Sequence, residues 1–207
     1  MTGFFSEKNK LIILFVVAVV FGLSLSFIFS RKIDPATLFI DSQAYKTTAL
    51  NVINHQVFSF YDRPPYEPSG FRAPGYPLWL AAIYLIFGSF KPAIFLGIFV
   101  FSLTAPLIYL IARELFDKRI AFLAGILFAL EPWGAFLAGA IMSEQIFLPM
   151  FVLAVYLFIR YLKQNSHKFL YLSAGLLGVC ALIRPNALYI WPIFAIFIFF
   201  KKNGFLK

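Results

Sequence analysis

One long polar stretch, set in a chain of almost continuous apolar sequence, constrains the fold more than any other feature. Residues 31–76 contain nine of the 27 charged residues among the 207 residues of the chain. The rest reads as apolar runs with short polar breaks, and about 20 apolar residues suffice to cross a hydrocarbon core roughly 30 Å thick. The sequence therefore predicts a membrane protein with one large polar loop after its first span.

The composition supports this prediction. It is 61% hydrophobic and only 13% charged, with a mean hydropathy of +0.85, which describes a chain whose surface faces lipid. The net charge of +9 comes from short basic clusters between apolar runs, a pattern typical of cytoplasmic loops rather than of nucleic-acid binding. We expect anionic lipid headgroups as partners of these clusters, and an all-α integral membrane fold.

The first apolar run, residues 11–29, follows a basic N-terminal segment and so resembles a secretory signal peptide. Its length of about 19 residues is greater than that of a signal-peptide core, and no convincing small-residue cleavage site follows it. We therefore interpret it as an uncleaved membrane span. The single cysteine, Cys180, lies inside another apolar run, which favours a packed thiol over a disulfide or a reactive group.

Six further apolar runs cover residues 77–90, 93–112, 120–142, 145–159, 169–183 and 187–200. If all of them crossed the membrane with the N-terminus inside, only four basic residues would be cytoplasmic and 14 would lie outside. If residues 77–90 instead form an interfacial or re-entrant helix, the cytoplasm receives 11 of the 18. These are Lys8, Lys10, Arg113, Lys118, Arg119, Arg160, Lys163, Lys168, Lys201, Lys202 and Lys207.

The run at 77–90 is also short, at about 14 residues, and is bounded by prolines. We therefore predict a single membrane domain over residues 1–207, in the cell or plasma membrane, with about six spans and both termini cytoplasmic. In this topology residues 30–91 form an outer loop with interfacial helices, residues 92–200 hold the remaining spans, and residues 201–207 form a basic cytoplasmic tail. Glu144 and Arg184 then lie on the outer face with the loop.

Within the loop, residues 44–58 are predicted to form an amphipathic helix on the membrane surface. Its apolar side would consist of Tyr45, Ala49, Val52, Ile53 and Val57, and its polar side would include Lys46, Asn51, Asn54 and Gln56. Asp41 precedes this segment, where a carboxylate can accept hydrogen bonds from backbone N–H groups as an N-cap. Capping leaves a catalytic role open, because a carboxylate held at a helix start has a fixed position.

Three further charged residues are candidates for a binding site. Arg72 lies in the turn-forming segment FRAPGYPLW, where its guanidinium could bind phosphate oxygens or merely anchor the loop to lipid headgroups. Glu144 and Arg184 each separate two apolar runs, and an unpaired charge at mid-bilayer costs roughly 2.5–3.5 kcal/mol. They therefore belong either to helix ends at the boundary or to a polar cleft that faces the loop. His55 has no second histidine or carboxylate pair nearby, so the sequence predicts no metal site on it.

An ordered set of motifs resembles a known family. The motifs are DSQAY at 41–45, RAPGYPLWLA at 72–81, LIARELFDKRIAFLAGILFALEP at 110–132, MSEQIF at 142–147 and LIRP at 182–185. Together, over about residues 11–200, they are similar to the N-terminal membrane module of the C-type glycosyltransferases, in the dolichyl-phosphate-mannose protein mannosyltransferase and aminoarabinose transferase superfamily. The resemblance implies a helical membrane bundle that transfers a sugar from a polyprenyl-phosphate donor to an acceptor on the outer face.

The resemblance also implies roles for particular residues. Asp41 matches the acidic residue of the first outer loop, which serves as catalytic base or positions the acceptor. Arg72 and Arg184 match the basic residues that hold the lipid phosphate, Glu144 matches the acid after the hairpin, and Tyr45 belongs to the first motif. Some members have an acidic pair in the first loop, whereas Ser42 follows Asp41 here. The binding of a divalent metal therefore stays an open alternative, and no cofactor is assigned.

At 207 residues the chain is shorter than typical members of this superfamily. The expectation is therefore a truncated or minimal transferase, with a partner membrane chain that supplies the missing helices. The alternative function is a non-catalytic carrier, flippase component or assembly subunit that binds a lipid-linked sugar phosphate at the same basic cleft.

Overall fold

The computed structural model describes residues 6–30 and 39–202, and every regular element among them is a helix. Three helical runs are long and apolar enough to cross a membrane: α1 (Glu7–Ser30), α4 with α5 (Lys91–Ser102 and Thr104–Leu115), and α8 (Glu144–Gln164). A fourth run would join α6 (Lys118–Ala129) to α7 (Pro132–Ala138) across a bend of 52°. The predicted all-α membrane fold is confirmed.

The remaining elements are shorter. They are α2 (Ile40–His55), α3 (Gly75–Phe87), α9 (His167–Ile183), the 3-10 helix η1 (Pro185–Ile190) and α10 (Trp191–Lys202). Helix α9 has 17 residues and α10 has 12, which is shorter than the roughly 20 residues that usually cross a membrane. The count of about six spans therefore stays a prediction. Residues 31–38 of the polar loop and 203–207 of the basic tail lie outside the described residues.

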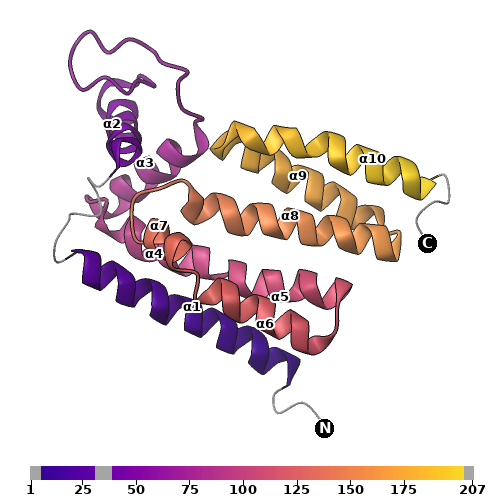
Figure 1. The fold of residues 1–207 in the computed structure, drawn as a ribbon. Coiled ribbons are helices and arrows are strands. Elements are labelled where there is room, and N and C mark those ends of the chain that lie inside the picture. Colours follow the sequence, from indigo (N-terminus) through magenta and orange to yellow (C-terminus); the bar gives the residue numbers. More distant parts are fainter. Residues whose placement is uncertain (1–5, 31–38, 203–207) are drawn as a thin grey trace.

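The long helices run back and forth along one direction. Figure 1 shows α1, α5, α6, α8, α9 and α10 lying along the bundle, while α2 and α3 are gathered at one end of it. The start of α1 and the end of α10 lie at the opposite end. This arrangement is the one expected if α3 does not cross the membrane and the number of crossings is even, because both ends of the chain then lie on the same side. The side of the membrane on which each end lies remains a prediction.

Two of the predicted continuous runs are interrupted, and proline explains both interruptions. The run at 93–112 is divided at Leu103 because Pro106, in the first turn of α5, has no N–H to continue the helical hydrogen bonds of α4. The run at 120–142 bends before α7, where Glu131 accepts hydrogen bonds from the backbone N–H groups of Trp133 and Gly134 and Pro132 occupies the first helical position.

Helix α3 packs against α2 and the end of α9 rather than along the bundle. Tyr76, Leu80 and Ala81 are buried in the core that α3 shares with Tyr45 of α2. Gly75, at the start of α3, lies so close to α9 that an added Cβ would be 2.8 Å from the backbone oxygen of Leu182. A glycine is therefore required where the polar loop turns onto α9.

Helix α2 forms where the amphipathic helix was expected, but the predicted boundaries and polar face are partly wrong. The helix ends at His55, and Gln56 follows in the left-handed conformation, so Val57 lies outside it. Asn51 was expected on the polar face, yet it is buried and its side-chain amide donates to the backbone oxygens of Ser59 and Tyr61, each at 2.8 Å. The sequence pattern could not reveal this, because the connector after α2 folds back over the helix and satisfies the amide.

Candidate functional site

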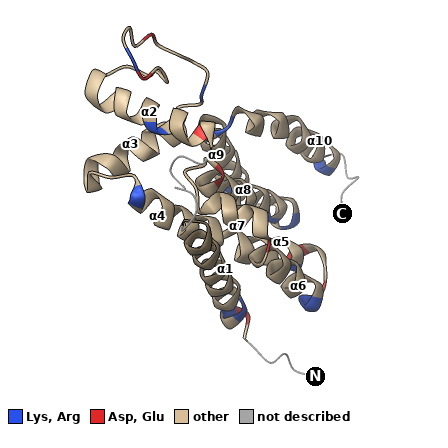
Figure 2. Cartoon of the chain, turned by 60° about the vertical axis from the view of Figure 1, so that its left-hand side comes forward, with Lys and Arg blue, Asp and Glu red and all other residues tan. Residues whose placement is uncertain are grey.

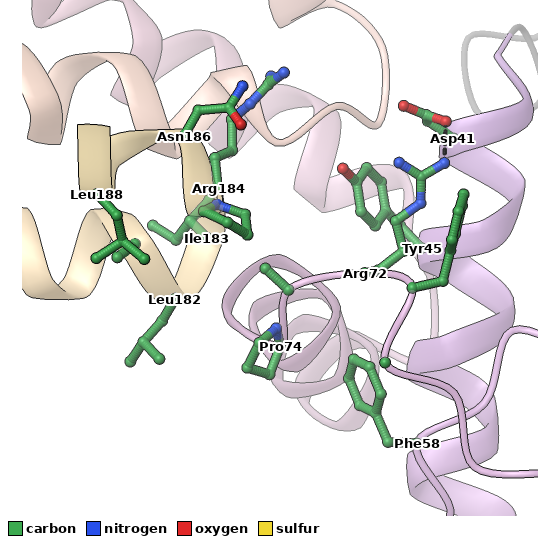
Figure 3. A pocket seen from close by; sticks show the side chains of 15 residues that line it. Asp41, Tyr45, Phe58, Arg72, Pro74, Leu182, Ile183, Arg184, Asn186 and Leu188 are labelled. Atoms are coloured by element: carbon green, nitrogen blue, oxygen red, sulfur yellow. Dashed lines mark hydrogen bonds and ion pairs between the residues drawn. The ribbon is translucent and has the colours of Figure 1, made fainter. Parts of the chain in front are cut away.

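A pocket of 580 Å³ lies where the polar loop meets the ends of α9 and η1. Its lining residues are Asp41, Tyr45, Phe58, Gly70, Phe71, Arg72, Ala73, Pro74, Ala181, Leu182, Ile183, Arg184, Pro185, Asn186 and Leu188. Figure 3 shows the charged ends of Asp41, Arg72 and Arg184 on one side of this pocket and Phe58, Pro74 and Leu182 on another. The pocket therefore combines a charged side with an apolar side.

The first charged group of the pocket is an ion pair between Arg72 and Asp41. The guanidinium of Arg72 also lies over two aromatic rings, 5.4 Å from the centroid of Tyr45 and 4.9 Å from that of Phe71. Its Nε is buried and has no hydrogen-bond partner among the described residues. The ion pair and the two rings thus hold the guanidinium of Arg72 in place, while its buried Nε has almost no accessible surface.

Asp41 is not the N-cap that the sequence predicted. The helix begins at Ile40, so Asp41 lies in its first turn, and the N-cap position is Phe39, which makes no side-chain capping bond. The carboxylate binds Arg72 instead, from a part of the chain 31 positions away. Local sequence favours a cap, but the tertiary contact with the FRAPGYP turn provides a cationic partner.

The second charged group is an ion pair between Arg184 and Glu144. Arg184 follows α9 in an extended conformation, before Pro185 begins the 3-10 helix, and Glu144 is the first residue of α8. A carboxylate in the first turn is favourable because it meets the positive end of the helix dipole. Glu144 and Arg184 therefore lie at helix ends and also belong to a polar cluster, so the two interpretations of these residues from the sequence are compatible.

Ser143 connects the two ion pairs through Tyr45. Its hydroxyl accepts a hydrogen bond from Tyr45 Oη at 3.3 Å and one from Arg184 at 3.5 Å, and donates to Glu144 at 3.5 Å. The structure thus brings all five predicted site residues into one cluster: Asp41, Tyr45, Arg72, Glu144 and Arg184. Ser143 was not predicted, although its position next to Glu144 in the MSEQIF motif was an available signal.

Two further buried polar residues were missed. The hydroxyl of Tyr76 donates to Gln145 Oε1 at 2.8 Å, and Gln145 Nε2 donates to the backbone oxygens of Ala138 and Ala140 at 2.8 and 2.7 Å. Burial raises the pKa of Tyr76 well above its usual value, and the nearby Tyr45 and Glu144 raise it further. The hydroxyl therefore stays protonated and remains a donor. The bonds fix the turn before α8 against α3, and so fix the position of Glu144.

The fit of Gln145 depends on Gly97 of α4. A Cβ at Gly97 would lie 2.1 Å from the Gln145 side chain, far inside contact distance. We expect Gly97→Val to destabilise the protein by about 1–3 kcal/mol, because Gln145 must leave its three partners. Thermal unfolding of the purified protein would measure this. Gly175→Val on α9 is the control, since an added Cβ there meets nothing within 4 Å, and equal losses in both variants would refute the explanation.

The described residues offer no evident metal centre. Across residues 6–30 and 39–202, no three His, Cys, Asp or Glu side chains are grouped so that they could hold a metal ion. Asp41 is followed by Ser42, which is buried and whose hydroxyl points to the sulfur of Met142. His55 instead stacks on Tyr66, with ring centroids 4.1 Å apart.

The sequence profile of the dolichyl-phosphate-mannose-protein mannosyltransferase family matches residues 71–207. The chain belongs to this family. The predicted resemblance is thereby confirmed. The protein is an integral membrane protein of a family of C-type glycosyltransferases. The mannosyltransferase match begins directly before Arg72 and includes Glu144 and Arg184, whereas Asp41 and Tyr45 precede it. No curated protein and no solved structure matches the chain.

Proposed function

We propose that this protein transfers a sugar from a polyprenyl-phosphate donor to an acceptor on the outer face of the membrane. The observation that carries the proposal is the pocket in which Arg72 and Arg184, each paired with a carboxylate, approach an apolar wall. A polyprenyl-phosphate sugar has matching parts: a phosphate for the arginines and an apolar chain for the wall. Family membership supports the same class of reaction.

The arginines would hold the donor phosphate. A guanidinium presents N–H donors in a planar fork that suits phosphate oxygens, and such charge-assisted bonds are roughly twice as strong as neutral ones. Arg72 lines the pocket, so the terminal N–H groups of its guanidinium that do not bind Asp41 would supply the donors. During transfer the bond between the anomeric carbon and the phosphate oxygen breaks, its electron pair stays on the phosphate, and the two cations stabilise the charge that develops there.

Asp41 would act as the general base. Its carboxylate takes the proton from the acceptor hydroxyl while that oxygen forms the new bond to the anomeric carbon. The ion pair with Arg72 holds the carboxylate on the charged side of the pocket, beside the group that binds the phosphate. A single displacement of this kind inverts the configuration at the anomeric carbon.

Glu144, Tyr45 and Ser143 would position these groups. Glu144 orients Arg184 through their ion pair, and Ser143 connects Arg184 to Tyr45. We expect Ser143→Ala to raise the KM for the donor by about tenfold while kcat changes little, because one hydrogen bond to a charged group is worth about 1.5–3 kcal/mol at most. Steady-state kinetics at varied donor concentration would test this, with Ser24→Ala as control, because Ser24 is exposed on α1 and lies outside the pocket. A fall in kcat at unchanged KM would contradict the positioning role.

The topology proposed with this function places the pocket outside and both termini in the cytoplasm. Figure 2 shows basic residues at the ends of α1, α6, α8 and α10 that lie away from α2. These ends contain Lys10 of α1, Lys118 of α6, Arg160 of α8 and Lys201 of α10, and Arg113 lies in the last turn of α5. An excess of lysine and arginine marks the cytoplasmic side of a membrane protein. Helix α10 has no buried residue, which leaves room for a partner membrane chain beside it as well as for lipid.

The test is a transfer assay with purified protein in liposomes. Each radiolabelled polyprenyl-phosphate sugar is supplied together with an extract of cell-envelope acceptors, and the products are separated from the lipid donor. We expect the label of at least one donor to appear in a product that is no longer lipid-linked. If every label stays on its donor while the lipid-linked sugar crosses the bilayer, the protein is a carrier and the transferase proposal is wrong.

A further inference from the structure

A second groove, larger than the pocket of the candidate site, lies at the end of the bundle away from α2. It has a volume of 680 Å³ and is formed by the end of α5 together with α8 and α10. Its lining residues are Leu115, Val155, Phe158, Ile159, Leu162, Lys163, Ile193, Phe194 and Phe197. All of these except Lys163 are apolar, and none of them lines the pocket of the candidate site. The groove is therefore an apolar space with one charged residue in its wall.

The charged residue lies at one end of the groove. Phe158 is buried and its ring stacks on that of Phe194, with centroids 3.8 Å apart, so the two rings close the groove between α8 and α10. Along α8 the lining extends from Val155 to Lys163, a rise of about 12 Å, which is close to the depth of one leaflet of a hydrocarbon core roughly 30 Å thick. Lys163 is exposed in the last turn of α8. The groove thus has the length of a lipid chain in one leaflet and a cation at its end.

Three basic side chains gather at this end around a single carboxylate. Lys163 lies 3.1 Å from Glu114, and Arg160 lies 3.9 Å from the same residue. Lys201 Nζ donates to two backbone oxygens in the last turn of α8, each at 2.7 Å, which places this ammonium beside the end of the groove. Figure 2 shows these basic residues at the ends of α8 and α10. The end of the groove therefore carries an excess of positive charge.

We propose that this groove binds one anionic phospholipid, with an acyl chain between α8 and α10 and its phosphate at Lys163 and Lys201. The apolar walls match the chain, and the excess of positive charge matches the headgroup, as in other basic pockets between membrane helices. A zwitterionic lipid has the same chain but brings its own cation to the basic residues. The site is at the other end of the bundle from Arg72 and Arg184, and its occupancy does not depend on sugar transfer.

Two pairs of variants separate the chain from the headgroup. Ile193→Trp narrows the groove from α10. Ile196→Trp is its matched control, because the two isoleucines are similarly exposed on one helix, at 47% and 53%, and Ile196 does not line the groove. Lys163→Gln removes the charge from the lining. Its control is Lys168→Gln, an exposed lysine at the start of α9 outside the groove. Leu115→Trp fills the groove from α5 if Ile193→Trp does not fold.

Native mass spectrometry of the protein in detergent counts the bound lipids as dioleoyl phosphatidylglycerol or dioleoyl phosphatidylcholine is added. We expect the wild type to bind the first phosphatidylglycerol about tenfold more tightly than phosphatidylcholine, because two lysines face its phosphate. Lys163→Gln should lower this preference by about fivefold, whereas Lys168→Gln should keep it. Ile193→Trp should weaken binding of both lipids by about tenfold, because less apolar surface is buried, and Ile196→Trp should match the wild type.

Four results would overturn the proposal. The first is equal affinity of the wild type for the two lipids, and the second is an equal change in a variant and its control. The third is binding of glycerol phosphate as tightly as phosphatidylglycerol, which would show an anion site without a chain. The fourth is a dimer of the wild type that excludes lipid and is lost in Ile193→Trp, which would make the groove an interface between two copies.

Discussion

The Asp41→Asn variant is expected to lose about 10²–10⁴-fold in the rate of sugar transfer and to bind the donor as tightly as the wild type. The amide keeps the shape and part of the hydrogen bonding of the carboxylate at the start of α2, but it cannot accept the proton of the acceptor hydroxyl. Donor affinity should be retained because Arg72, freed from its ionic partner, still faces the phosphate position.

Initial transfer rates and equilibrium donor binding, measured on the same preparations, check this prediction. Asp62→Asn is the matched control, since Asp62 is an exposed carboxylate of the same polar loop and lies outside the pocket. Transfer at the wild-type rate in Asp41→Asn would remove Asp41 from the role of base. A parallel loss of donor binding and transfer would indicate that the carboxylate only positions Arg72.

The Arg184→Gln variant is expected to weaken donor binding by about 10–150-fold, which corresponds to loss of a charge-assisted contact worth about 1.5–3 kcal/mol. Glu144 then also loses its cationic partner, and an unpaired carboxylate at the apolar boundary is unfavourable. Because both side chains are partly exposed, the loss of stability should be smaller than for a fully buried pair.

A double variant separates the two effects. Arg184→Gln combined with Glu144→Gln should recover the stability lost in the single variant but not the affinity for the donor. Arg63→Gln, an exposed arginine of the connector, is the control for general charge effects. If the double variant binds the donor like the wild type, Arg184 does not hold the phosphate and serves only to neutralise Glu144.

Much of the fold could be predicted because apolar runs of helical length have few alternatives in a membrane. Residues 77–90 were excluded from the spans because of how the basic residues of the other loops are distributed. The corresponding helix α3 lies with α2 at one end of the bundle (Figure 1). The breaks at Leu103 and before α7 were missed, since hydropathy measures apolar length and not backbone continuity. Pro106 and Pro132 carried the relevant signal.

The members of the candidate site could be predicted more readily than their contacts. Charged residues in a membrane protein are conspicuous, so Asp41, Arg72, Glu144 and Arg184 stood out from the sequence alone. Which carboxylate pairs with which arginine depends on how α2, α8 and α9 pack, and no local pattern encodes that. Ser143 and Gln145 were missed for a related reason, because uncharged polar residues become informative only when their burial is known.

The most direct test of the account combines the site with the topology. Cys180 is the only cysteine of the chain, and Cys180→Ser with Asn186→Cys places a single thiol in the lining of the pocket. A membrane-impermeant maleimide, added to sealed liposomes on the side of the donor, should label this variant and abolish transfer. The same reagent should neither label Cys180→Ser with Lys118→Cys nor affect its transfer, because the proposed topology places Lys118 on the cytoplasmic side. Full transfer after complete labelling at position 186, or labelling at position 118 from the donor side, would contradict the account.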